Sequence, residues 1–203
     1  MADYRILEIA EAINQLVADL PLGGMQEKRM HLKFGQASSG RWRVFGRTLI
    51  HGSEEYIFHK GGSTEFQFNL GEEEDPISGN RRVRYGLALS YQPTREIPDP
   101  LVSLADQTAR LNQLIRDGSP LLKGLSMTVY TPGRDGREHV DVQSPLKPID
   151  PAVHSFYFLG RFIPRTLKGL LEGDLRVIAL GLNYLLPLYE AVEFEPASDA
   201  PVR

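Results

Sequence analysis

The residues best equipped for chemistry in this sequence are basic and aromatic side chains gathered between positions 28 and 47. Cationic side chains neutralise phosphates and release counterions, and an aromatic face can stack on a base that has left the duplex. The pattern therefore favours a surface for a polyanion, and the competing interpretation is a solvated strand face with Trp42 in the core. The cations are Lys28, Arg29, Lys33, Arg41, Arg43 and Arg47, and Phe34, Trp42 and Phe45 are interleaved with them.

A second basic cluster, Arg81, Arg82 and Arg84, precedes a strand-like run that begins at Tyr85. In the first stretch, Gly35 and the Ser-Ser-Gly sequence at 38–40 let the backbone come close to a ligand. Strand alternation over 42–50 predicts Trp42 on one face, with the arginines that flank it on the other.

Sequence signatures of several enzyme classes are missing. The chain holds no phosphate loop ending in Gly-Lys-Ser or Gly-Lys-Thr, no dinucleotide fingerprint, no Gly-x-Ser-x-Gly elbow and no His-Glu-x-x-His motif. It has no Cys, and its five His residues lack acidic partners at metal-site spacing. We therefore expect no catalytic residue, no metal and no cofactor.

Two other functions stay open. A metal-dependent nuclease subunit would use widely spaced carboxylates, for which Glu138 and Asp141 with Gln143 and Lys147 are candidates, although a hairpin surface explains them as well. A protein-interaction module would dock a partner through the last predicted helix and Tyr189.

The elements that must position these residues follow from apolar periodicity. A spacing of three and four residues predicts helices over 3–20, 99–118 and 174–192, with Asp99 as an N-cap and Pro187 as a kink. Alternation or short apolar runs predict strands at 30–34, 42–50, 55–59, 65–70, 85–91 and 156–162, and a hairpin of 125–130 with 139–142. We expect the 65–70 strand to be buried on one face only.

Helices alternating with runs of strands predict a single-domain α+β fold with a mixed or antiparallel central sheet flanked by helices. We assign 1–195 to the domain and 196–203 to a flexible tail. The 203 residues carry a net charge of −3, with 41% hydrophobic residues, which suits a globular chain. No signal peptide and no apolar run of about 18 residues is visible, so we expect a cytoplasmic protein without a membrane partner.

Three motifs together resemble the N-terminal DNA-binding domain of McrB-type proteins, the specificity modules of modification-dependent restriction systems. They are the basic run Arg29 to Gln36 followed by Trp42, the Tyr-Gly-Leu strand at 84–90, and the helix start at Asp99-Pro100. A closing pattern at 158–160 and 185–190 is also similar. The resemblance covers most of the chain.

The resemblance implies recognition of a modified cytosine in double-stranded DNA, extruded into an aromatic-walled pocket, with a GTPase domain and a nuclease subunit elsewhere. It implies a base pocket formed by Phe34, Gly35, Gln36, Trp42 and Tyr56. Gln36 stands where the best-known member has a Tyr, so either Tyr56 supplies a stacking wall or the preferred modification differs. The DNA backbone would contact Lys28, Arg29, Lys33, Arg41, Arg43, Arg47, Arg81, Arg82 and Arg84.

Overall fold

The computed structural model describes residues 6–36, 43–50, 56–132, 138–152 and 155–194, without the side chains of 47–50 and 138. Within these residues, seven strands form one antiparallel sheet in the order β1-β2-β3-β4-β7-β5-β6. The strands are β1 (Phe45–Ile50), β2 (Tyr56–His59), β3 (Gln67–Glu74), β4 (Arg81–Ser90), β5 (Ser126–Pro132), β6 (Glu138–Gln143) and β7 (Phe156–Ile163). This confirms the predicted α+β class.

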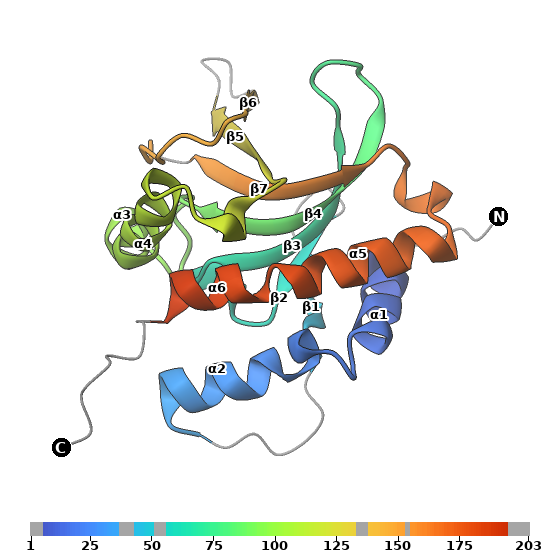
Figure 1. The fold of residues 1–203 in the computed structure, drawn as a ribbon, viewed down its shortest axis with the longest axis horizontal. Helices are drawn as coiled ribbons and strands as arrows, with labels where there is room; N and C mark the ends of the chain where they lie inside the picture. The colour runs from blue at the N-terminus through green and yellow to red at the C-terminus, as the bar shows by residue number, and fades with distance from the viewer. Residues whose placement is uncertain (1–5, 37–42, 51–55, 133–137, 153–154, 195–203) are drawn as a thin grey trace.

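Helices flank the sheet, and α5 followed by α6 crosses in front of its middle strands (Figure 1). The α-helices are α1 (Ile6–Leu16), α2 (Met25–Phe34), α3 (Pro100–Ser103), α4 (Ala105–Arg116), α5 (Glu172–Tyr184) and α6 (Leu186–Glu193). Short 3-10 turns occupy Pro21–Gly24, Gly62–Thr64, Pro120–Leu122 and Leu167–Gly169. The main core lies between helices and sheet, where side chains such as Ile13 of α1, Leu87 of β4 and Ile178 of α5 are fully buried.

Two glycines allow the closest contacts between neighbouring elements inside this core. Gly86 of β4 lies opposite Gly160 of β7, and a Cβ built on Gly86 would lie 2.2 Å from the Leu159 carbonyl oxygen. On α5, a Cβ at Gly181 would lie 2.5 Å from the Tyr85 ring. Since neither distance is compatible with a side chain, the packing of β4 against β7 and α5 depends on these glycines.

Several predicted elements are confirmed. The Asp99 carboxylate accepts a hydrogen bond from the Val102 backbone N–H and starts α3, although the predicted helix is interrupted at Leu104. The hairpin is β5 with β6, and the last helix breaks at Leu185, two residues before Pro187. The predicted flexible tail lies outside the described residues.

The strand predicted at 30–34 is wrong, because this segment is the end of α2. Its alternating side chains, which include Leu32 and Phe34, are about half exposed. The face that α2 buries carries Met25, Gln26 and Arg29, so it is held by polar contacts and shows no apolar helical period. Gly35 follows in the left-handed conformation, at φ 61°, and ends the helix.

Strand β3 also differs from prediction, since both of its faces are buried. Phe68 and Leu70 face the main core, while Gln67 and Asn69, expected to be exposed, are at most 3% exposed. These polar side chains satisfy one another, because Asn69 Nδ2 donates to Gln67 Oε1 over 3.0 Å. A buried polar face is stable when its groups are hydrogen-bonded.

By length and composition, one described helical stretch, Glu172–Glu193, is apolar enough to cross a membrane. Half of its most apolar window is buried inside the fold, as in the core helix of a globular protein.

Candidate functional site

A buried charge cluster fastens α2 to the body of the protein. Glu65, at the entry to β3, is 3% exposed and its carboxylate accepts four hydrogen bonds or ion pairs. The donors are Arg29 Nε at 2.6 Å, Lys33 Nζ at 3.0 Å, Tyr189 OH at 2.8 Å and His59 Nε2 at 3.3 Å. Lys33 Nζ also lies 2.6 Å from Glu193 Oε2, so Arg29 and Lys33 of α2 are matched by two buried acids.

The hydrogen bonds of His59 fix its tautomer. The backbone N–H of Phe68 donates to His59 Nδ1 over 3.0 Å, so the ring proton sits on Nε2 and points to Glu65. Burial lowers the pKa of His59, which keeps the ring neutral. Burial alone would raise the pKa of Glu65, but the His59 hydrogen bond and the charges of Lys33 and Arg29 lower it to about 2.

On the opposite face of the sheet, Arg84 is enclosed by aromatic rings. The guanidinium carbon lies 5.5–5.6 Å from the ring centres of Tyr56, Tyr130, Phe156 and Phe158. Its Nη1 donates to Glu73, and Nε donates to Asn69, which extends the polar row along β3. Arg84 is 3% exposed, so it stabilises this face and has no path to a bound phosphate.

The predicted DNA-backbone cations separate into buried and accessible groups. Seven of the nine have described side chains, and each of these forms an ion pair inside the chain. Four side chains are largely buried in their pairs, with exposed fractions from 3% to 22%: Arg29, Lys33, Arg82 and Arg84. Three are half exposed: Lys28 with Glu190, Arg43 with Glu11 and Arg81 with Glu72. Exposed pairs contribute only about 0–1 kcal/mol, so these three cations can exchange a carboxylate for a phosphate.

The accessible cations lie at two distant places. Lys28 is on α2 and Arg43 lies two residues before β1, and α2 and β1 lie toward the same end of the molecule (Figure 1). Arg81 begins β4, in the hairpin with β3 that projects on the far side from α2 (Figure 1). Arg41 and Trp42 lie outside the described residues, as does the side chain of Arg47.

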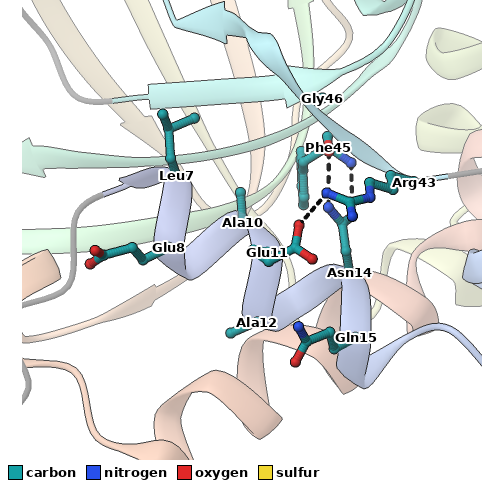
Figure 2. A pocket seen from close by; sticks show the side chains of 10 residues that line it. All are labelled: Leu7, Glu8, Ala10, Glu11, Ala12, Asn14, Gln15, Arg43, Phe45 and Gly46. Carbon is teal, nitrogen blue, oxygen red and sulfur yellow. Dashed lines mark hydrogen bonds and ion pairs between the residues drawn. The ribbon is translucent and has the colours of Figure 1, made fainter.

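A hollow of about 620 Å³ lies between α1 and β1 (Figure 2). Asn14 ties the two elements together, since its Nδ2 donates to the Phe45 carbonyl over 2.9 Å and its Oδ1 accepts from the Phe45 N–H over 3.0 Å. Arg43 reaches Glu11 over 2.6 Å. The complete lining is Leu7, Glu8, Ala10, Glu11, Ala12, Asn14, Gln15, Arg43, Phe45 and Gly46.

A second hollow, of about 370 Å³, lies along α2 and is lined by Gly24, Glu27, Lys28, His31 and Gln36. Gln36 and Arg43 mark the two ends of the connection from α2 to β1. One hollow therefore lies at each end of the connection that carries Arg41 and Trp42.

The described part of the predicted base pocket is spread over two regions. Phe34, Gly35 and Gln36 are exposed at the end of α2, and the Phe34 ring lies 5.4 Å from the Arg29 guanidinium carbon. Tyr56 is on β2 and packs beside Arg84 on the face of the sheet opposite the main core. The described residues of the predicted pocket therefore belong to two different elements, the end of α2 and the start of β2.

The residues named for the two alternative functions lie in different environments. Asp141 is exposed on β6, and within the described residues no group of three or more His, Asp or Glu side chains is arranged to hold a metal. The side chain of Glu138 is outside the described set. Tyr189 is fully buried against Glu65, which excludes it as a docking residue in this conformation.

Comparison with known proteins finds no matching family model, no similar curated protein and no similar solved structure.

Sequence reasoning missed Glu65 and Asn14. Glu65 stands at the start of an alternating strand pattern, where an acidic residue is expected to face solvent. Its basic partners lie more than thirty positions away in the sequence. Asn14 sits on the polar side of an amphipathic helix pattern, and nothing local indicates that it caps the Phe45 backbone.

Proposed function

We propose that this chain is a DNA-recognition domain of a modification-dependent restriction system, which takes an extruded, modified cytosine into a hollow beside the α2–β1 connection. The observation that carries the proposal is the pair of hollows at the two ends of that connection. In the sequence, this connection carries Arg41 and Trp42, a cation and the only Trp of the chain.

The surface that would meet DNA is smaller than the sequence pattern suggests. Arg29, Lys33, Arg82 and Arg84 hold the fold and Arg81 lies on the distant hairpin, so the described cations available for phosphate beside the hollows are Lys28 and Arg43. Both are half exposed and pair with exposed or half-buried acids, so a phosphate can replace the acid at little cost. Phosphate contacts set the position of the duplex, and the hollow would supply selectivity.

The hollow between α1 and β1 has the size and the chemistry for a base. Its volume of about 620 Å³ falls in the range of small-ligand sites, roughly 300–1,000 Å³. Leu7 and Ala12 offer apolar surface, while Glu11 and Gln15 offer an acceptor and an amide for the edge of a base. Extruding a base costs a few kcal/mol, which such contacts offset.

The test is a titration of fluorescent duplexes that differ in one cytosine, plain or modified, at several salt concentrations. We expect tighter binding of a modified duplex and a logarithmic affinity that falls linearly with the logarithm of salt. Lys28→Gln and Arg43→Gln should each weaken binding to both duplexes and lower the salt slope by about 1.

Arg81→Gln is the matched control, because Arg81 is an equally exposed, ion-paired cation on the distant hairpin. Its affinity and salt slope should equal those of the unmodified chain. Negligible binding of every duplex at low salt would refute the proposal, and so would an equal loss for Arg81→Gln and Arg43→Gln.

A further inference from the structure

Helix α5 presents an apolar stripe on its outer side. Val177, Leu180 and Tyr184 are 53%, 60% and 55% exposed, and Gly173 and Pro187 extend the stripe at its two ends. The five positions are spaced 4, 3, 4 and 3 residues apart, which is the heptad period of helices that pair along a seam. Helix α6 follows α5 along nearly the same direction, so the stripe is continuous across the break at Leu185 (Figure 1).

The inner side of the same helix packs against the core. Ile178, Ala179 and Leu182 are at most 2% exposed, and Gly181 sits against the Tyr85 ring. The exposed stripe is therefore not needed for the core. Contiguous exposed apolar surface at regular spacing is typical of a contact with another chain.

We propose that this stripe pairs with the same stripe of a second copy of this chain, with the two helices antiparallel around a two-fold axis. Charge complementarity selects this occupant. Arg176 and Glu190 lie along the same flank of the stripe, fourteen residues apart, with Asn183 midway between them. They occupy the heptad position next to the seam, whose side chains face each other across an antiparallel pair.

In that register Arg176 of one copy faces Glu190 of the partner, and the two-fold axis repeats the contact. Asn183 then faces Asn183 of the partner, so two uncharged amides meet at the axis. A parallel arrangement would instead align the two helix dipoles unfavourably and give no opposite charge to Arg176. Arg176 is 65% exposed and Glu190 is 29% exposed, and in the contact each would exchange its partner within the chain, Glu172 and Lys28 respectively, for the other.

The stripe is about 21 Å long, from fourteen residues at roughly 1.5 Å each. A seam of this length buries less than the roughly 800 Å² per partner of a standard stable interface. We therefore expect a reversible dimer that forms in the micromolar range or above and is monomeric in dilute solution.

Analytical ultracentrifugation over a concentration series of the full chain tests the association. Leu180→Asp should weaken it at least tenfold, because a charge would enter the middle of the seam. Val102→Asp is the matched control, since Val102 is a 73% exposed apolar residue on α3, away from the stripe. This variant should associate like the unmodified chain.

Disulfide trapping tests the register, and it is direct because the chain has no Cys. Asn183→Cys should form a covalent dimer under mild oxidation, whereas Arg176→Cys alone should not. Mixing Arg176→Cys with Glu190→Cys should give the mixed dimer.

Three results would each overturn the proposal. They are a monomer at every concentration up to about 0.5 mM, an association that Leu180→Asp leaves unchanged, and a monomer that binds phosphatidylcholine–phosphatidylglycerol vesicles through Leu180. A dimer that traps equally well at 176 and 183 would overturn the antiparallel register.

Discussion

Replacing Glu65 by Gln removes the centre of the buried charge cluster. The variant keeps the shape of the side chain but loses its charge, and an N–H₂ group replaces one of two oxygens that each face two donors. Lys33 then keeps Glu193 as a buried partner, and Arg29 loses the carboxylate it pairs with. Breaking a buried ion pair from one side typically costs about 3–5 kcal/mol, so we expect a loss of that size at pH 7.

The pH dependence of stability gives an independent value for the stabilisation that Glu65 contributes. The pKa of Glu65 falls from 4.5 to about 2 in the folded chain, and each pH unit corresponds to about 1.4 kcal/mol. Glu65 therefore contributes about 3 kcal/mol to the free energy of unfolding, since its side chain is 2% exposed and solvent screens it little. Because the folded pKa is the lower one, this contribution is present above pH 4.5 and is lost as pH falls toward 2.

Urea unfolding of both proteins at several pH values between 7 and 2 measures this contribution. The other carboxylates are common to both chains, so the difference between the two stability curves isolates Glu65. We expect the difference to shrink by about 3 kcal/mol between pH 5 and pH 2.

Glu172→Gln is the matched control, because its pair with Arg176 is an exposed contact within one helix. It should change the free energy of unfolding by less than about 0.5 kcal/mol. Two parallel curves for Glu65→Gln and the unmodified chain would refute this reasoning. If Glu65→Gln does not fold, Tyr189→Phe removes a single donor to Glu65 and should cost about 1.5–3 kcal/mol.

Three further outcomes are expected. Gly86→Ala should destabilise the fold by several kcal/mol in urea unfolding, since backbone atoms of β7 occupy the space, whereas Gly24→Ala meets nothing within 4 Å and should be tolerated. Asn14→Ala leaves the buried Phe45 N–H and carbonyl without partners and should cost about 1–3 kcal/mol by the same measurement. Long-range ¹H–¹⁵N spectra at pH 7 should show His59 as the neutral tautomer protonated at Nε2, and a protonated Nδ1 would contradict the assigned hydrogen bonds.

The parts of the fold that sequence reasoning predicted are those with a local physical cause. The Asp99 cap, the break near Pro187 and the short apolar run of β7 each follow from residues within a few positions of one another. For the same reason the α+β class could be predicted from the order of helical and strand patterns.

Helix α2 could not be predicted, because the residues that stabilise it are distant from it in the sequence. Leu32 and Phe34 alternate like strand residues, whereas Arg29 and Lys33 are spaced for a helix whose partners come from β3 and α6. In α2, ion pairs with distant residues stabilise a helix although the local pattern favours a strand. Such ion pairing also moved four of the predicted DNA contacts into the interior, which composition alone does not reveal.

The sheet order has a consequence for synthesis of the chain on the ribosome. Strand β7 fills the gap between β4 and β5, so one side of β4 stays without hydrogen-bonding neighbours until residue 163 has been made. Nascent or prematurely terminated chains would display this open, largely apolar edge, which is a template for intermolecular strand pairing. Shortened versions designed to end before β7 should therefore precipitate, and a chaperone that shields strand edges would be needed to keep them in solution.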